Sequence, residues 1–407
     1  MNFRQKILLL FFLMAGSLLQ AQSYKKLHKK SLVVDTHNDV ISSVVMRGLH
    51  IEDDLTGKTH SDLTRFKKGG IDVQVFSIWC DEHFGRDTAF KYANIEIDSL
   101  YSIAERNPDR LLIVRTPDEL KSCVKNHKLA AMIGVEGGHM IEDNIMYLDS
   151  LFSRGARYMT LTWNNSTSWA SSAKDETSDS AKILKKGLNE FGEKVVKRMN
   201  ELGMMVDLSH VGEQTFWDAI HLATKPVIAS HSCTYALCPV FRNLKDEQIM
   251  AIGKNGGLIS LNFFSGFVDS SFSRKEKKFM AEHKAEIDSL SQLKWNDLKI
   301  TIWMSSKYPG ILEEMRPPLS LLMDHLDYIV RLIGVDHVGL GSDFDGIQSS
   351  PQQLNGVQDM PIITKELRAR GYNKNEIRKI LGGNFLRVFQ ANIRSQESPG
   401  RPEDRNL

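Results

Sequence analysis

Eight short apolar runs that alternate with helical patterns constrain the fold of this 407-residue chain most strongly. Strands that are apolar along their whole length are typical of a parallel sheet covered by helices on both faces. The runs occupy residues 32–36, 71–79, 129–136, 157–163, 204–209, 226–230, 257–262 and 337–342. Eight such units predict an α/β fold closed into a (β/α)8 barrel of the TIM type, with functional residues at the carboxyl ends of the strands. An open doubly wound sheet is the alternative, but no GxGxxG motif follows the first run.

Two of the segments between these runs have the apolar spacing of amphipathic helices. One spans residues 191–202 and is expected to end at Gly203, and the other spans residues 321–332 and stops at Gly334. Apolar residues at intervals of three and four form one stripe, and glycine ends a helix because it adopts left-handed backbone readily. Both stripes are therefore expected to pack against the sheet.

The segment from about residue 265 to 318 breaks the alternation. It follows the seventh predicted strand, is rich in Lys, Glu and Ser, and includes a helix-like run at 274–293. On a barrel this position lies over the active-site rim, so we expect a helical insertion or lid. A solvated excursion without a role in binding is the alternative. Residues 22–394 are expected to form a single domain, and residues 395–407 a disordered polar tail.

Residues 1–21 have the pattern of a secretory signal peptide. Arg4 and Lys6 precede an apolar run from Ile7 to Leu19, and the small residue Ala21 ends the segment. A short apolar run with these flanks is typical of a cleaved leader, although an uncleaved anchor helix is the alternative. The sequence therefore predicts export to the periplasm or the cell exterior, with no membrane span in the mature chain.

Charge and cysteine usage exclude several classes of partner. The 52 Lys and Arg residues include Arg4 and Lys6, so removal of the leader leaves 50 of them against 50 Asp and Glu. This balance gives no electrostatic support for binding nucleic acid or anionic lipid, and it favours a small-molecule substrate. The four cysteines lack the spacing of a zinc site and are interpreted mostly as packing residues, with a disulfide left open.

Metal-ligand residue types follow five of the predicted strands. After the first run, alternation along the strand would turn His37 and Asp39 to one side and Asn38 to the other. Alone, that triplet is also typical of a polar strand end with a surface histidine. Further candidates stand after later runs, namely Glu136, His210, His231 and Asp343. Imidazoles and carboxylates together at one barrel mouth are the ligands that zinc and similar metals prefer.

The composition of this set favours hydrolytic chemistry. One His-Asp pair, one His-His pair and a single glutamate are typical of two metal ions with Glu136 between them. Two such ions can share a water molecule and lower its pKa. A carboxylate outside the ligand set would then act as general base and acid, and Asp343 is the candidate. The same turn contains Asp345, which is the alternative.

The sequence around these residues resembles the membrane dipeptidase family, also called the renal dipeptidase family. The likeness runs from about residue 31 to 394, and the motifs keep the family's order at residues 34–39, 134–137, 206–211, 230–232, 242–243 and 339–346. Members of that family are metal-dependent hydrolases on an amidohydrolase-type barrel. The resemblance therefore implies a barrel enzyme that hydrolyses dipeptides.

The resemblance also implies roles for individual residues and a possible homodimer. It implies two zinc ions per subunit, one held by His37 and Asp39 and the other by His210 and His231, with Glu136 bridging them. It further implies that Arg242 binds the terminal carboxylate of the substrate, a bidentate task that suits a guanidinium group. The residues around Arg242 have no local pattern that would predict this role.

One expected substrate position departs from the family. Vertebrate members carry a histidine after the fourth strand, where this chain has Trp163 followed by Asn164. An indole cannot accept a proton, although its N–H can donate to an oxyanion. Trp163 and Asn164 are expected to bind substrate, with rate and substrate choice altered. The vertebrate disulfides and lipid-anchor tail are not carried over to this chain.

The leading prediction is an exported zinc-dependent dipeptidase that cleaves dipeptides with a free C-terminal carboxylate through attack of a bridging hydroxide. A deaminase, lactonase or phosphoesterase on the same barrel is one alternative, and Arg242 distinguishes it because such substrates need no carboxylate clamp. A non-catalytic metal-binding homologue is the other. Three further histidines, His139, His325 and His337, are interpreted as structural.

Overall fold

The computed structural model describes residues 23–85, 87–178, 185–293, 295, 300, 303–304 and 306–393. The predicted leader at 1–21 and the predicted polar tail at 395–407 lie outside these residues. Among the helices that are described, none is long and apolar enough to cross a bilayer.

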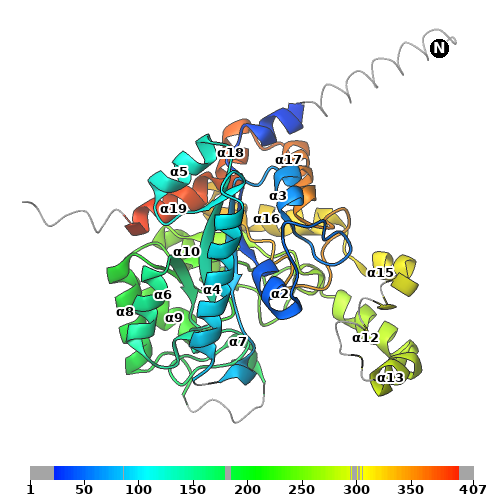
Figure 1. Ribbon diagram of the computed structural model, residues 1–407, viewed down its shortest axis with the longest axis horizontal. Helices are drawn as coiled ribbons and strands as arrows, with labels where there is room; N and C mark the ends of the chain where they lie inside the picture. Colours follow the sequence, from blue (N-terminus) through cyan, green and yellow to red (C-terminus); the bar gives the residue numbers. More distant parts are fainter. Residues whose placement is uncertain are drawn as a thin grey trace, which may run out of the picture.

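The centre of the molecule is a barrel of parallel strands (Figure 1). In order around the barrel they are β1 (Val34–Asn38), β2 (Val73–Ile78), β4 (Leu129–Glu136), β5 (Ala156–Thr160), β6 (Met205–Asp207), β7 (Ile228–Ala229), β8 (Leu258–Leu261) and β9 (Val338–Leu340). Each of the eight predicted runs overlaps one of these strands. The predicted (β/α)8 barrel is therefore confirmed.

The barrel closes between β9 and β1 at its carboxyl end. The backbone N–H of Asp39 donates to the carbonyl oxygen of Phe344 at 2.9 Å, and the N–H of Asp343 donates to the carbonyl oxygen of His37 at 3.1 Å. These bonds involve residues beyond the end of β9. Closure thus fixes the backbone of three predicted site residues, His37, Asp39 and Asp343, against one another.

One further strand, β3 (Leu111–Ile113), was not predicted. It pairs in parallel with the first residues of β4, outside the order of the barrel strands. Only Leu111 of this strand is buried. A segment of this length with one buried side chain is too short to show the period of two that identifies a strand in a sequence.

Two buried aspartates tie neighbouring strands together. Asp35 of β1 accepts hydrogen bonds from the N–H and the hydroxyl of Ser342 at 2.7 and 2.6 Å. Asp207 of β6 accepts from the N–H and the hydroxyl of Ser230 at 2.8 and 2.6 Å, and from the hydroxyl of Thr160 at 2.5 Å. Both side chains are fully buried, so these bonds satisfy groups that water cannot reach.

Helices surround the barrel (Figure 1). The first predicted stripe is α8 (Glu190–Leu202), which ends at Gly203 with a φ of 78°. The second is α16 (Leu319–Ile333), which ends at Gly334 with a φ of 84°. The other helices outside the segment between β8 and β9 are α2 (Val40–Arg47), α3 (Leu63–Gly69), α4 (Ala89–Arg106), α5 (Pro117–Lys125), α6 (Ile145–Ser153), α7 (Ala173–Thr177), α9 (Glu213–Leu222), α10 (Asp246–Asn255), α17 (Met360–Ala369), α18 (Lys374–Arg378) and α19 (Asn384–Ile393).

The segment between β8 and β9 contains α11 (Ser265–Val268), α12 (Phe272–Glu282), α13 (Lys284–Gln292) and α15 (Pro309–Met315). In Figure 1, α12, α13 and α15 form a lobe that projects beside the barrel. The lobe has a small core of its own, made by Phe272, Phe279, Leu290, Ile300, Met304 and Met315. The helical character expected for this segment is thus present, and the lobe stands to one side of the strand ends.

We predict that Asp35 makes stability depend on pH. Burial raises the pKa of Asp35 to about 6, above the value of about 4 of an unfolded chain. The folded state therefore holds the proton more tightly, and the wild type loses stability as pH rises through this range. The free energy of unfolding, measured with urea, should fall by about 2 kcal/mol more in the wild type than in the Asp35→Asn variant between pH 4 and pH 7.5.

The matched control for this measurement is Asp109→Asn, since Asp109 is exposed. The difference in free energy of unfolding between this variant and the wild type should stay constant over the same pH range. A flat difference for Asp35→Asn as well would contradict the assignment of the pH dependence to Asp35.

Candidate metal centre

The first pair of predicted ligands comes from the end of β1. His37 lies in the strand and Asp39 follows it, with His37 Nε2 3.4 Å from Asp39 Oδ2. Asn38 turns away and donates its amide N–H to the hydroxyl of Ser61 at 2.8 Å. The alternation expected from the sequence is therefore present, and His37 and Asp39 share one side.

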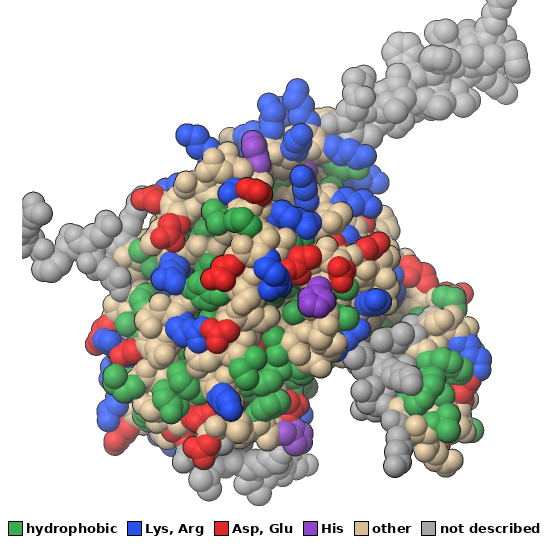
Figure 2. Space-filling model, viewed as in Figure 1, with side chains coloured by type: hydrophobic (Ala, Val, Ile, Leu, Met, Phe, Trp, Pro, Cys, Tyr) green, Lys and Arg blue, Asp and Glu red, His purple; other side chains and the backbone are tan. Residues whose placement is uncertain are grey.

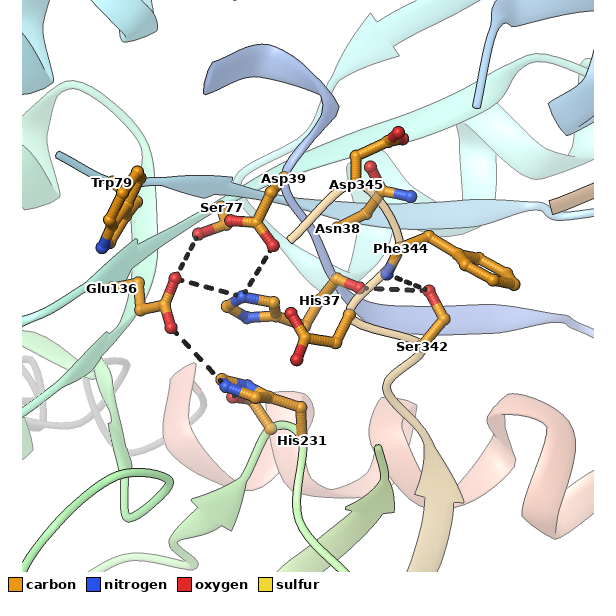
Figure 3. Close-up of polar contacts among 12 residues, drawn as sticks. His37, Asn38, Asp39, Ser77, Trp79, Glu136, His231, Ser342, Phe344 and Asp345 are labelled. Atoms are coloured by element: carbon orange, nitrogen blue, oxygen red, sulfur yellow. Dashed lines mark hydrogen bonds and ion pairs between the residues drawn. The ribbon is translucent and has the colours of Figure 1, made fainter. Parts of the chain in front are cut away.

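Glu136, the last residue of β4, lies among three imidazoles, of which Figure 3 shows those of His37 and His231. Its Oε2 is 3.4 Å from His37 Nε2, and its Oε1 is 2.9 Å from His210 Nε2 and 3.6 Å from His231 Nε2. The Nε2 atoms of His210 and His231 are 3.0 Å apart. Four strands, β1, β4, β6 and β7, thus direct ligand-type atoms to one place at the carboxyl end of the barrel.

Each imidazole is oriented through its other nitrogen. The Nδ1 of His37 is 2.8 Å from the hydroxyl of Tyr158, and that of His231 is 2.7 Å from the hydroxyl of Ser230. Both hydroxyls donate their own hydrogen elsewhere, to the carbonyl oxygen of Thr36 and to Asp207. They therefore accept from Nδ1–H, which leaves Nε2 as a lone pair directed at Glu136.

His210 is held in the same way by a residue expected to bind substrate. Its Nδ1 is 3.2 Å from Oδ1 of Asn164, an acceptor, so Nδ1 again carries the hydrogen. The backbone of His210 has a φ of 65°, an uncommon left-handed conformation for this residue type. Asn164 thus contacts a predicted metal ligand and orients the ring of His210.

The residues fit a metal cofactor. Two groups of three could each hold an ion, His37 with Glu136 and His231, and His37 with Asp39 and Asp343, because within each group the ligand atoms lie within 4.8 Å of one another. Among the described residues, His37 Nε2 and Asp39 Oδ2 are buried without a hydrogen-bond partner. Buried polar atoms are rarely left unsatisfied, and metal coordination would satisfy both.

The electrostatics of the cluster favour the forms that bind cations. Burial lowers the pKa of His210 to about 4 and holds that of His231 well below its usual range, so both rings are neutral. Burial opposes charge on Glu136, but His37 and His210 hold its pKa well below the usual range. Burial also opposes charge on His37, yet Tyr158, Asp39 and Glu136 raise its pKa well above normal, so without a metal ion this ring holds a proton that an ion would displace. The site therefore requires positive charge at its centre.

Asp343 and Asp345 differ in where their carboxylates point. Asp343 belongs to one of the ligand-type groups and accepts from the amide N–H of Asn262 at 2.8 Å. Burial, together with Asp39 and Glu136, raises the pKa of Asp343 well above its usual range. The carboxylate of Asp345 accepts from the N–H of His60 at 2.6 Å and points away from the cluster in Figure 3. Asp343 is thus the carboxylate of this turn that belongs to the cluster.

Arg242 is buried beside the cluster, in the loop between β7 and α10. It donates to the carbonyl oxygen of His231 at 3.2 Å, and its guanidinium carbon is 5.3 Å from the centre of the Phe267 ring. Its Nε has no partner among the described residues. Burial lowers its pKa, although Asp343 and Glu136 oppose that shift. A buried guanidinium with an unused donor is suited to binding an anion.

A cavity of about 400 Å³ opens over the cluster, a volume typical of small-molecule sites. Its lining includes four of the predicted site residues directly over the metal position, Asp39, Glu136, His210 and Asp343, together with the expected substrate residues Trp163, Asn164 and Arg242. A larger cavity of about 690 Å³ lies between the lobe and the loop after β9. None of the ligand-type groups found among the described residues lines that second cavity.

Several residues that shape the site were missed by the sequence analysis. Tyr158, Ser230 and Asn262 act through other side chains, which no local pattern reveals. Trp79 stands directly after β2, as Glu136 stands at the end of β4, so its place at a strand end follows from the sequence. It was missed because only metal-ligand residue types were considered at the strand ends.

The residues interpreted as structural have ordinary partners. A ring nitrogen of His139 is 3.0 Å from the carbonyl oxygen of Cys80, one of His325 is 3.0 Å from that of Val268, and one of His337 is 2.9 Å from that of Gly257. All four cysteines are buried and free. None of these residues takes part in the metal centre.

A parallel barrel that presents histidines and carboxylates at the carboxyl ends of its strands defines a metal-dependent hydrolase of the barrel type. A family profile described as membrane dipeptidase, peptidase family M19, matches residues 21–399. The chain belongs to this family, and it is a metallopeptidase-type hydrolase that acts on dipeptides.

Two relatives illustrate the extent of the likeness. An uncharacterised dipeptidase of Schizosaccharomyces pombe is 29% identical over 391 residues, which cover 91% of this chain and 83% of that protein. Dipeptidase 3 of Mus musculus is 29% identical over 364 residues, which cover 88% of this chain. The match spans 64% of the length of the mouse protein, so that protein includes sequence without a counterpart here.

Two solved structures share the fold. The dipeptidase AC, a metallopeptidase of family M19, has a TM-score of 0.71 at 25% identity, and the match covers 89% of this chain and 98% of that one. A metallopeptidase of Rhodobacter sphaeroides has a TM-score of 0.71 at 24% identity, covering 89% of this chain and 100% of that one. The latter was solved with a phosphinate mimic of the dipeptide L-Ala-D-Ala.

We predict that metal binding stabilises the folded protein through these side chains. Zinc at a concentration a thousandfold above its dissociation constant should add about 4 kcal/mol to the free energy of unfolding, and EDTA should reverse this. The Glu136→Ala variant should lose most of the increase in melting temperature. Metal content after gel filtration, measured by mass spectrometry, should fall in parallel.

His221→Ala is the matched control, because His221 is exposed on α9. It should bind metal and gain stability as the wild type does. Full metal content in Glu136→Ala would contradict the centre described above.

Proposed function

We propose that the protein is a zinc-dependent dipeptidase that cleaves dipeptides with a free C-terminal carboxylate. The observation that carries the proposal is the buried guanidinium of Arg242 beside the cluster of Glu136, His210 and His231. A carboxylate at Arg242 would hold the peptide bond of a dipeptide over the cluster. A bound pair of zinc ions would supply a water molecule activated for attack on that bond.

The ligand roles that we propose follow the geometry. His37 and Asp39 would hold one ion, His210 and His231 the other, and Glu136 would contact both. Support comes from the two carboxylate oxygens of Glu136, of which one faces His37 and the other faces His210 and His231. The neutral state of His210 and His231 also supports ligation, since metals bind unprotonated imidazole.

Asp343 would move the proton. Its raised pKa means that the carboxylate takes up a proton readily, and Asn262 donates a hydrogen bond to its Oδ2. Asp343 would accept the proton of the attacking water and deliver it to the amine that leaves when the peptide bond breaks. Trp163 can share no part of this transfer, because an indole has no basic nitrogen.

We also propose that residues 22–394 work as one domain after removal of the leader at 1–21, with the chain exported. The support is the charged start and the short apolar run of that leader. A deaminase, lactonase or phosphoesterase would need no carboxylate clamp at the place of Arg242.

We predict that the C-terminal carboxylate is required for turnover. Wild-type enzyme loaded with zinc should cleave L,L- and L,D-dipeptides, and kcat/KM should fall roughly 100-fold or more when the C-terminus is amidated. The Arg242→Met variant should lose this discrimination, because the partner of the carboxylate is gone.

Arg370→Met is the control for that variant, since Arg370 pairs with Asp324 and Asp327 far from the site. It should keep the discrimination. Cleavage of no member of the dipeptide panel, with zinc bound, would contradict the proposed function as a whole.

We predict that Asp343→Asn lowers kcat by about 100-fold to 10,000-fold, the usual contribution of a general acid and base. Zinc content should remain close to that of the wild type. Asp345→Asn tests the alternative carboxylate of the same turn, and it should retain most of the activity because its contact with His60 survives as a hydrogen bond to the amide oxygen. A larger loss of kcat in Asp345→Asn than in Asp343→Asn would assign the proton transfer to Asp345 instead of Asp343.

A further inference from the structure

Two tryptophans form one wall of the cavity over the metal centre. Trp79 follows β2 and Trp163 follows β5, and these two strands flank β4, which carries Glu136. The ring centres of the two indoles are 5.0 Å apart and the ring planes meet at 60°. Figure 3 shows Trp79 beside Glu136 at one side of the cluster. The pair therefore makes a continuous aromatic surface next to the reacting position.

This wall lies across the barrel from Arg242. Around the barrel the order is β1, β2, β4, β5, β6, β7, β8, β9, so the place opposite β4 is β8. Arg242 comes from the loop after β7 and packs on Phe267, which follows β8. A dipeptide with its carboxylate at Arg242 and its peptide bond at Glu136 would direct its N-terminal residue toward Trp79 and Trp163.

Buried groups hold the wall in place. The carboxylate of Glu96, a fully buried residue of α4, accepts a hydrogen bond from the backbone N–H of Trp79 at 2.7 Å. Gly137 follows Glu136 with a φ of 109°, and a Cβ atom there would stand 3.3 Å from the Cβ of Trp163 and 2.4 Å from the ring of His139. Glycine at 137 thus leaves the space that the side chain of Trp163 needs beside Glu136.

The chemistry of the wall is apolar. Trp79 and Trp163 line the cavity together with Met46, whereas the carboxylates of Asp39, Glu136 and Asp343 belong to the ligand-type groups. Indole faces gain most from covering another aromatic or large aliphatic group, because they present wide rigid apolar area and favour offset or edge-to-face ring contacts.

We propose that Trp79 and Trp163 form the subsite for the side chain of the substrate's N-terminal residue and select aromatic and large aliphatic side chains there. The inference rests on the proposed dipeptidase function and adds the class of dipeptide to it. Glu96 is a positioning residue that keeps Trp79 in the wall. A dipeptide with glycine at its N-terminus leaves the wall uncovered and is the poorer substrate.

The test compares two dipeptides, L-Phe-D-Ala and Gly-D-Ala, on the zinc-loaded enzyme. The wild type should favour L-Phe-D-Ala by at least tenfold in kcat/KM. Trp163→Leu and Trp79→Leu should each lower that ratio by fivefold or more. Trp217→Leu is the matched control, because Trp217 lies on α9 and does not line the cavity, and it should leave the ratio unchanged.

A second measurement does not depend on turnover. Uncleavable phosphinate mimics of the same two dipeptides are titrated calorimetrically, and the benzyl-bearing mimic should bind at least tenfold more tightly to the wild type and lose that advantage in Trp163→Leu. Cleavage of both dipeptides at equal kcat/KM would overturn the inference and leave the proposed function standing. Cleavage of neither dipeptide and binding of neither mimic would overturn both. Glu96→Gln should keep the ratio, since its amide oxygen still accepts from Trp79, and Glu96→Leu should lower it.

Discussion

The position of one buried carboxylate, that of Glu136, determines the arrangement of the rest of the site. It ends β4, a strand in which every residue is buried, and its ion-pair partners among the described residues are three histidines. An ionised group in such a place is stable only with compensating charge and hydrogen bonds. The imidazoles of His210 and His231 are neutral and direct lone pairs at this carboxylate, so the compensating charge is a proton on His37 or the metal ion that displaces it.

The orientation of two of these imidazoles comes from hydroxyl groups of the barrel wall. Tyr158 of β5 holds His37, and Ser230, bonded to Asp207, holds His231. The ligand atoms are therefore placed by buried hydrogen bonds that belong to the barrel itself. This rigidity also explains the left-handed backbone of His210 and Asp343, with φ of 65° and 61°. Such strain of about 1 kcal/mol or more per residue persists only where surrounding structure fixes the conformation.

The sequence was sufficient for the barrel and for the strand-end residues because both depend on local periodicity. Apolar runs identify buried strands, and a polar residue directly after a run in a parallel sheet must stand at the carboxyl end. β3 could not be predicted because only one of its side chains is buried. Arg242 was reached through the family resemblance alone, since its neighbours become Phe267 and His231 only after the loop folds.

The same limit applies to Asn164 and Trp79, whose contacts are set by residues distant in the sequence. Asn164 lines the cavity where contact with substrate is expected, and its amide oxygen also orients His210. Trp163, which replaces the histidine of the vertebrate members, contacts Trp79 from another strand. The two indoles together form one aromatic surface. The cavity is thus divided into a cationic side at Arg242 and an aromatic side at the tryptophans, with Glu136 between them. A substrate that satisfies both sides must carry an anion and an apolar group on opposite sides of the bond that reacts, and a dipeptide with a large N-terminal side chain has this arrangement.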